Sequence, residues 1–438
     1  MALASFVGTT IEWYDFFLYG TASALIFGRL FFPNYDPLTG TLASFGTYAA
    51  GFAARPVGAV ICGHFGDRIG RRSMLVLTLL IMGIATFLIG LLPTYSTIGI
   101  WAPILLVVMR LAQGFAVGGE WGGAVLMAVE HSPKGRRGFY GSWPQIGVPA
   151  GLLLSTGIFS LITMLSEEAQ LSWGWRVAFL LSIFLVSVGL FIRLRVVEPP
   201  IFTEIKQKRA EARMPIFDTI RHHPINLLLA MGARVADNAV FYIYTVFILT
   251  YATQPQIGFS RSTVLNAVSI AAVIQLIALP AYGWLSDRVG RRPVYLFGAI
   301  FTALFAFPFF RLIETASPLF LVLAIVIALI VGHSAMYGPQ ASFFSELFGT
   351  RVRYTGVSIG YQLSSVLAGG LSPLIATELL RRTGSSWPIA IYIIGISLIT
   401  TISVFLASET AHNDIVAEAG SLDTPGAPAK FISEGIER

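Results

Sequence analysis

The chain has 438 residues, of which 55% are hydrophobic and only 12% are charged, well below the roughly 25% charge of soluble domains. No soluble fold could bury that much apolar surface, so the composition excludes a soluble protein. The net charge of +6 would suggest a nucleic-acid partner in a soluble chain. Here basic loops on one side of a membrane account for it, and we expect no nucleic-acid binding.

Apolar stretches of about 18 or more residues recur along the chain, each long enough to cross about 30 Å of hydrocarbon. They predict an all-α polytopic membrane protein with twelve transmembrane helices in two pseudo-symmetric six-helix bundles. The first six spans are expected at 5–31, 41–65, 73–92, 98–130, 138–165 and 173–195. The last six are expected at 223–252, 262–285, 293–312, 316–347, 353–381 and 387–409.

The chain is predicted to divide into two halves, at 1–195 and 223–410, separated by a charged cytoplasmic linker at 196–222. The tail at 411–438 is polar and rich in Gly, Pro and Glu, so we expect it to be disordered and cytoplasmic. The first apolar segment lacks a basic n-region and a cleavage site, which predicts a transmembrane helix rather than a cleaved signal peptide. Cys62 is the single cysteine and implies no redox function.

Basic residues gather in the loops after spans two, four, eight and ten: Arg68, Arg71, Arg72, Lys134, Arg136, Arg137, Arg288, Arg291, Arg292, Arg351 and Arg353. The opposite loops at 93–97 and 166–172 contain none. Because basic loops stay in the cytoplasm, this asymmetry places both termini there and predicts a multi-pass protein of the bacterial inner membrane.

A ten-residue motif, Gly63-His-Phe-Gly-Asp67-Arg68-Ile-Gly70-Arg71-Arg72, returns 220 residues later as Gly283-Trp-Leu-Ser-Asp287-Arg288-Val-Gly290-Arg291-Arg292. Each copy lies between two apolar spans. An Asp at a helix end can accept hydrogen bonds from a facing helix N-terminus, and the arginines offer donors to carboxylates or lipid phosphates. We therefore predict a cytoplasmic latch in each half, pairing Asp67 with Arg71 and Asp287 with Arg291. Anchoring by positive charge alone would explain the arginines but not the Asp and Gly.

This duplicated motif, together with twelve spans, resembles the major facilitator superfamily over almost the whole chain. Two further segments, Thr9-Thr-Ile-Glu12-Trp-Tyr-Asp15-Phe-Phe-Leu-Tyr19-Gly20 and Arg110-Leu-Ala-Gln113-Gly114-Phe-Ala-Val-Gly118-Gly-Glu120-Trp121-Gly-Gly123, are similar to signatures of its metabolite:proton symporter branch. Members of that branch transport shikimate, proline and betaine, α-ketoglutarate and citrate. The resemblance implies a proton-coupled symporter.

Ionisable groups inside apolar spans cost at least a few kcal/mol each, so they are expected to face a cavity or a partner. Glu12 and Asp15 lie three residues apart, and repulsion between two carboxylates in a low dielectric favours protonation of one. The alternative is a hydrogen bond to a neighbouring helix. Arg110 and Glu120 are roughly 15 Å apart along the axis and cannot meet directly. The superfamily resemblance implies proton coupling for Arg110, and a structural ion pair remains the alternative.

Arg234 and Asp237 lie three residues apart in span seven and can pair with each other. Such a pair is either self-neutralised or available to a substrate carboxylate, which a guanidinium binds in a bidentate manner. The candidates for proton coupling are Asp15, Glu12, Glu120, Asp237 and Arg110. The candidates for substrate binding are Arg234, Tyr19, Gln113, Trp121, Asn238, Tyr242, Gln145, Gln275, Gln340 and Gln362, although amides serve equally well as bonds between helices.

The resulting hypothesis is uptake of a small polar metabolite, an organic acid or a zwitterionic osmolyte, by proton symport and alternating access. We expect a monomer in the lipid bilayer, with no metal and no cofactor other than the proton gradient. The alternatives are a proton-driven exporter of the same fold and a non-transporting receptor. An enzyme is not expected, because the nucleophile-elbow pattern Gly356-Val-Ser358-Ile-Gly360 lies inside an apolar helix. No phosphate loop is present, so direct ATP-driven pumping is not expected either.

Overall fold

The computed structural model describes residues 2–69, 71–118, 125, 128–129, 132–133, 135–195, 224–348 and 353–411. Within these ranges the side chains of 2–5, 63–69, 71–73, 75, 192–195 and 353–356 are not described. Every regular element in the described part of the chain is a helix. The linker at 196–222, the tail after Ala411 and the end of the fourth span lie outside it, apart from isolated residues of that span.

The first half contains α1 (Ala2–Ala22), η1 (Ser23–Phe27), α2 (Gly28–Phe31), α3 (Pro37–Ile69), α4 (Arg71–Leu91), α5 (Tyr95–Ile98), α6 (Trp101–Gly118), α8 (Arg137–Gly141), α9 (Trp143–Ile162), α10 (Glu167–Ala169), η2 (Gln170–Gly174), α11 (Trp175–Leu180) and α12 (Ser182–Arg195). The second half contains α15 (Pro224–Tyr242), η3 (Ile243–Phe247), α16 (Ile248–Ala252), α17 (Arg261–Val289), α18 (Arg291–Glu314), α19 (Pro318–Ile327), η4 (Ala328–His333), α20 (Ser334–Leu347), α21 (Arg353–Ser364), η5 (Ser365–Gly370), α22 (Ser372–Thr383) and α23 (Trp387–Leu406).

Consecutive helices join into continuous segments that match the twelve expected spans. Nine described segments are long and apolar enough to cross a membrane, among them Pro224–Ala252 and Pro318–Leu347. The remaining three segments are the one that runs from α1 through α2, the helix α3, and the helix α4. In α4 the apolar part is shorter, at Val76–Leu91. The prediction of an all-α polytopic protein is confirmed. Its span boundaries agree to within six residues wherever both ends are described.

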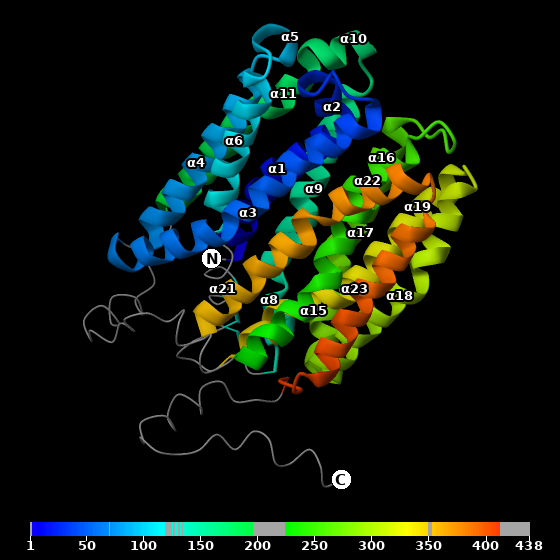
Figure 1. Ribbon diagram of the computed structural model, residues 1–438. Coiled ribbons are helices and arrows are strands. Elements are labelled where there is room, and N and C mark those ends of the chain that lie inside the picture. The colour runs from blue at the N-terminus through cyan, green and yellow to red at the C-terminus, as the bar shows by residue number, and fades with distance from the viewer. Residues whose placement is uncertain are drawn as a thin grey trace.

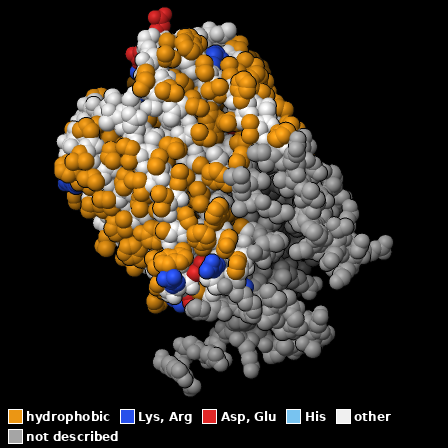
Figure 2. Space-filling model, turned by 180° about the vertical axis from the view of Figure 1, so that it is seen from behind, with side chains coloured by type: hydrophobic (Ala, Val, Ile, Leu, Met, Phe, Trp, Pro, Cys, Tyr) orange, Lys and Arg blue, Asp and Glu red, His pale blue; other side chains and the backbone are white. Residues whose placement is uncertain are grey.

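The two sets of helices lie side by side, with α1 to α12 in one group and α15 to α23 in the other (Figure 1). They meet mainly where α9 packs on α17, where α3 packs on η5 and α22, and where α8 packs on α17 and α20. Hydrophobic side chains are spread over the described part of the face seen in Figure 2, and most of the few charged ones there lie near its upper and lower ends. This distribution is that of a protein surrounded by lipid.

Local helix irregularities repeat with the same period as the motif. The π-helical turn η1 (Ser23–Phe27) and the turn η3 (Ile243–Phe247) interrupt the first and seventh spans, 220 residues apart. Such turns insert an extra residue into a helix and often occur at functional sites. The internal repeat therefore extends from sequence to backbone geometry.

Candidate functional site

Glycines bring α3 and α6 into direct backbone contact at the centre of the first group. A methyl group at Gly114 of α6 would overlap the carbonyl oxygen of Gly51 on α3, and one at Gly118 would overlap that of Arg55. Small residues permit this approach because nothing but hydrogen projects between the helices. As a result Arg55 from α3 and Arg110 from α6 enter the same buried region, with exposed fractions of 1% and 0%.

Arg110 lies in a polar chain that leads toward α4. Its Nη1 donates to Oε1 of Gln113 at 3.0 Å, and Nε2 of Gln113 donates to the hydroxyl of Thr86 at 2.7 Å. The guanidinium carbon is 4.1 Å from the centroid of Phe16 and 4.5 Å from that of Tyr19, and such ring faces attract a cation. Among the described residues Arg110 forms no ion pair, so the structural ion pair considered above is not found there.

Arg55 is a buried cation that the sequence reasoning missed. Its guanidinium carbon lies 4.2 Å from the centroid of Phe16 and 4.3 Å from that of Phe52. Its Nε and Nη2 are buried and have no hydrogen-bond partner in the described part of the chain. The criterion that selected Arg110, an ionisable group inside an apolar span, applies equally to Arg55. The internal repeat gives a second signal, since the position 220 residues after Arg55 is occupied by the candidate Gln275.

The predicted pair in span seven forms, and α20 holds it in place. Arg234 Nη1 lies 3.3 Å from Asp237 Oδ2 and also donates to Oε1 of Gln340. Nε2 of Gln340 donates to Asp237 Oδ1 at 2.9 Å and to the hydroxyl of Tyr295 at 2.8 Å. The Tyr361 ring centroid lies 3.3 Å from the Arg234 guanidinium carbon. This arrangement fits the self-neutralised alternative, because the charges of Arg234 and Asp237 compensate each other.

Asp15 is a buried carboxyl in the first span. It is 1% exposed, and it lies beside the hydroxyl of Thr86, yet neither of its oxygens has a hydrogen-bond partner of good geometry among the described residues. Glu12, three residues earlier, is 6% exposed. A bare carboxylate in apolar surroundings is costly, whereas a protonated carboxyl is not. Thr86 and Gln113 lie between Asp15 and Arg110.

Aromatic side chains from both helix groups meet beside these charges. The Tyr242 ring packs against Phe52 with centroids 5.4 Å apart and against Phe16 at 6.1 Å. The hydroxyl of Tyr19 shares a hydrogen bond of 2.6 Å with that of Thr47. Asn238 lies one turn from Tyr242, and its amide nitrogen is buried with no described partner. Tyr19 and Tyr242 thus flank the arginines.

Two of the amide candidates connect the helix groups. Nε2 of Gln145 donates to the carbonyl of Tyr337 at 3.2 Å, and Nε2 of Gln362 donates to that of Gly118 at 3.1 Å. Gln275 instead donates to Nδ1 of His333, within the second group, at 2.8 Å. The side-chain oxygens of all three glutamines have no described partner. Gln145 and Gln362 therefore bridge the halves, whether or not they also contact a substrate.

Several predicted site residues cannot be placed. Glu120, Trp121 and Gly70 lie outside the described residues, as do the side chains of the rest of the first motif copy: Gly63, Asp67, Arg68, Arg71 and Arg72. Their assigned roles stay predictions. Among the residues that are described, no three His, Cys, Asp or Glu side chains lie close enough to hold a metal ion.

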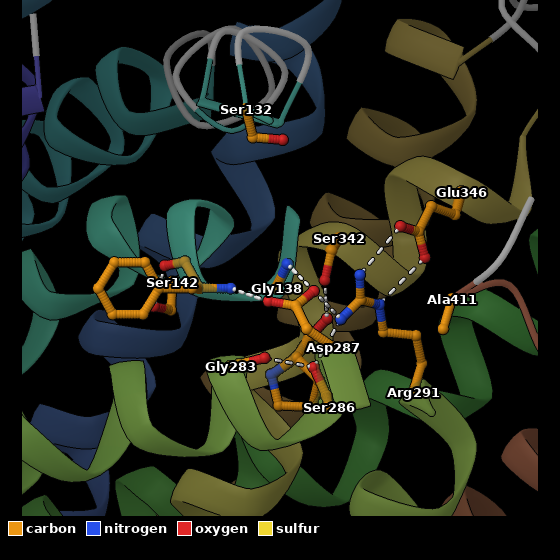
Figure 3. Close-up of polar contacts among 12 residues, drawn as sticks. Ser132, Gly138, Ser142, Gly283, Ser286, Asp287, Arg291, Ser342, Glu346 and Ala411 are labelled. Atoms are coloured by element: carbon orange, nitrogen blue, oxygen red, sulfur yellow. Dashed lines mark hydrogen bonds and ion pairs between the residues drawn. The ribbon is translucent and has the colours of Figure 1, made fainter. Parts of the chain in front are cut away.

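The second motif copy joins the two helix groups at one end (Figure 3). The carboxylate of Asp287 accepts hydrogen bonds from the backbone N–H of Gly138 at 2.7 Å and of Phe139 at 2.9 Å, both at the start of α8. Arg291 Nη1 donates to the same carboxylate at 2.8 Å. A methyl group at Gly283 would come within 2.5 Å of the Gly138 carbonyl oxygen, so the glycine permits this contact.

Two carboxylates that the sequence reasoning did not identify complete this cluster. Nε and Nη2 of Arg291 donate to the two oxygens of Glu346, each at 3.2 Å, in a bidentate pair. Glu409, beyond the end of α23, accepts from the backbone N–H of Arg291 at 2.9 Å and of Arg292 at 3.0 Å. Burial alone would raise the pKa of Glu409, but these donors and the N–H groups of Ala411 and Thr410 outweigh it and lower the pKa. Glu409 thus caps the start of α18.

The other motif residues have different contacts. Arg288 stacks on Trp284, with its guanidinium carbon 3.9 Å from the ring centroid. Arg292 Nε donates to the carbonyl of Val404 at 3.2 Å, and its Nη2 donates to that of Phe405. Gly290 has a φ of +108°, which side chains rarely adopt, so the chain can turn sharply between α17 and α18. Of the three arginines, Arg291 alone pairs with carboxylates among the described residues.

In the described part of the chain, two groups of long apolar helices with buried polar side chains between them and a polar contact at one end are typical of a secondary membrane transporter. The chain belongs to the major facilitator superfamily. Residues 1–226 match the family described as "Sugar (and other) transporter", and residues 230–433 match "Major Facilitator Superfamily". The resemblance inferred from the motifs is confirmed.

Similar proteins extend over almost the whole chain. The shikimate transporter of Escherichia coli (strain K12) is 45% identical, with 93% of this chain and 94% of that protein covered. The proline/betaine transporter of Salmonella typhimurium (strain LT2) is 34% identical, with 94% and 84% covered. The crystal structure of a D-xylose-proton symporter aligns with a TM-score of 0.73 at 17% identity, covering 94% of this chain and 98% of that one. This last similarity shows the fold alone.

Proposed function

We propose that this transporter takes up a small metabolite bearing a carboxylate, by symport with protons and by alternating access. The observation that carries the proposal is a row of buried polar side chains, Asp15, Thr86, Gln113 and Arg110, of which the last three are joined by hydrogen bonds. In this proposal Asp15 carries the proton and is separated from the fixed positive charge of Arg110 by the side chains of Thr86 and Gln113. The relatives named as shikimate and proline/betaine transporters support a small metabolite as the cargo.

Electrostatics would couple proton and substrate in this arrangement. An anion bound beside Arg110 adds negative charge near Asp15 and favours the protonated carboxyl. By reciprocity, protonation of Asp15 favours binding of the anion. Each ligand thereby makes the other easier to load. Asp237 is less suited to this role, because Arg234 and Gln340 already hold its carboxylate.

The second motif copy supports alternating access. The arginine-rich loops place its end of the molecule in the cytoplasm in this proposal. The Asp287 contact with α8 then closes the cytoplasmic end, and it must break before the substrate can leave on that side. The first motif copy, with Asp67 and Arg71, would form the matching latch in the other half.

Uptake into proteoliposomes tests the proposal. The labelled panel contains shikimate, proline, glycine betaine, α-ketoglutarate and citrate, each supplied with an inward proton gradient, an inward sodium gradient or none. We expect accumulation of a carboxylate beyond equilibrium under the proton gradient alone. Asp15→Asn should abolish accumulation while sparing exchange of labelled for unlabelled substrate, and Glu12→Gln shows whether the neighbouring carboxyl also contributes.

Three outcomes would contradict it. Accumulation driven by the sodium gradient instead of the proton gradient would show that sodium is the coupling ion. Extrusion in response to the gradient, instead of uptake, would indicate an exporter. Saturable binding without any flux would indicate a receptor. Normal gradient-driven accumulation by Asp15→Asn would remove Asp15 from the coupling mechanism.

A further inference from the structure

Arg55 and Arg110 present the same unused edge of the guanidinium group. In both residues Nε and Nη2 are buried and have no hydrogen-bond partner among the described residues. These two nitrogens form the side of the guanidinium that binds the two oxygens of a carboxylate in parallel. Arg110 uses its Nη1 for Gln113, which leaves Nε and Nη2 without a hydrogen bond, and Nε lies next to Gly51, where a methyl group would be 2.5 Å away.

The two edges lie within one aromatic enclosure. Both guanidinium carbons are close to the Phe16 ring, at 4.2 Å for Arg55 and 4.1 Å for Arg110. The Tyr48 ring centroid lies 4.5 Å from the Arg110 guanidinium carbon, and the buried Tyr48 hydroxyl lies next to that guanidinium without a hydrogen bond of good geometry among the described residues. Phe52 closes the side next to Arg55. The region therefore combines flat apolar walls with several unsatisfied donors.

Two buried guanidinium groups lie in this enclosure. Neither arginine forms an ion pair in the described part of the chain. A cation over an aromatic ring gains only part of what burial costs it. A buried donor normally has an acceptor, so two unused bidentate edges indicate that an acceptor arrives from outside the protein.

We propose that Arg55 and Arg110 together bind the carboxylate of the substrate, and that Arg55 selects organic anions over zwitterions. This inference rests on the proposed function and narrows its substrate class. The quaternary ammonium of betaine or the secondary ammonium of proline would meet two fixed positive charges where it needs a negative one. The ring faces that would attract it already face the guanidinium groups.

Binding to the purified full-length protein in detergent, without any gradient, tests this inference separately from proton coupling. Isothermal titration compares shikimate, benzoate and α-ketoglutarate with glycine betaine, proline and the uncharged methyl esters of shikimate and benzoate. We expect at least one acid to bind, its ester to bind much more weakly, and the zwitterions not to compete. The absence of binding by every acid at millimolar concentration, or tighter binding of a zwitterion, would overturn the inference.

Arg55→Lys keeps the charge but removes the bidentate edge, and it should weaken binding of the acid about 10- to 100-fold. Binding of the ester should not change, which separates recognition of the carboxylate from general damage to the site. Arg55→Gln should weaken acid binding further. Arg176→Lys is the matched control, because Arg176 also lies over a ring, 4.5 Å from Trp175, but donates to the carbonyls of Gly90 and Leu92.

Equal losses for acid and ester in Arg55→Lys, or no loss for either, would contradict the role of Arg55. The two proposals can fail independently. Anion binding that persists without gradient-driven accumulation would defeat proton symport and leave this inference standing. Proton-driven accumulation of a zwitterion would support proton symport and would contradict the selection of organic anions by Arg55.

Discussion

The carboxylate of Asp287 accepts a hydrogen bond of 2.7 Å from the backbone N–H of Gly138. The two residues belong to different helix groups, so this bond ties the two halves of the protein together (Figure 3). The acceptor is charged and the donor is a fixed backbone group. Such a bond is strong when formed and is lost completely when the halves separate. That makes it suited to a contact that forms and breaks in each transport cycle.

Asp287→Asn should therefore favour separation of the halves at this end. The amide retains one acceptor oxygen but loses the charge, which weakens the bonds to α8 by about 1–3 kcal/mol. Ser142 is fully buried beside Gly283, so a cysteine there reports on opening. In a Cys62→Ser background, we expect Ser142→Cys to react with maleimide about tenfold faster when Asp287→Asn is added.

Arg288→Gln is the control for this measurement, since Arg288 stacks on Trp284 and does not take part in the contact. It should leave the labelling rate unchanged. If the cysteine of Ser142→Cys reacts no faster in the presence of Asp287→Asn than in its absence, the bond to Gly138 does not hold this end closed.

The pair of Arg291 and Glu346 gives a prediction about non-additivity. Their side chains are 1% and 0% exposed, so Arg291→Met leaves Glu346 buried with its main partner removed. Loss of one member of a buried pair costs about 3–5 kcal/mol, whereas replacing both members costs much less. We expect Arg291→Met/Glu346→Gln to be more stable than Arg291→Met in thermal unfolding in detergent. A double variant that loses the sum of both single effects would show that the two side chains act independently.

The spans could be predicted from sequence because lipid imposes a length and an apolar composition on each one. The close contacts of the site could not. The partner of Asp287 is the backbone of Gly138, and a backbone group leaves no signature in the sequence. Glu346 lies 55 residues from Arg291, and only the packing of α20 against α18 brings the two together.

Arg55 was missed for a different reason. It stands in an apolar span without a neighbouring charge or a recognised motif, whereas Arg110 belongs to one. Its importance comes from the backbone contact between α3 and α6, which depends on Gly51 and Gly114. Glycine spacing showed that helices could approach closely, but it did not show which helices would meet or which side chains would face each other.

That backbone contact predicts opposite effects for two glycine substitutions. Gly114→Ala places a methyl group on the carbonyl oxygen of Gly51, and the resulting shift of α6 should destabilise the protein by at least about 1–3 kcal/mol. Gly395→Ala, within α23, meets nothing within 4 Å. It should be neutral or stabilising, by up to about 1 kcal/mol, because alanine favours the helix. Thermal unfolding of the two variants measures the difference, and equal stability would refute the close contact.

Glu409 gives a prediction about pH. Backbone N–H groups at the start of α18 and in the adjoining chain lower its pKa below the ordinary value of 4.5. A carboxyl with a lowered pKa in the folded state contributes stability above its unfolded pKa and loses that contribution as the pH falls through the folded pKa. Glu409→Gln should therefore cost about 1 kcal/mol at pH 7, as the loss of a helix cap does, and progressively less below about pH 4.5.

Chemical unfolding of the parent and of Glu409→Gln in detergent, at intervals from pH 7 down to pH 3.5, measures this difference. Glu168→Gln is the matched control, since Glu168 is exposed on α10, and its effect should be small at every pH. A penalty for Glu409→Gln that stays constant down to pH 3.5 would mean that the carboxylate charge does not stabilise α18. If the loss of stability disappears at low pH, the charge of Glu409 stabilises the start of α18. Glu409, in the segment after α23, binds the N–H groups of Arg291 and Arg292 in the second motif copy.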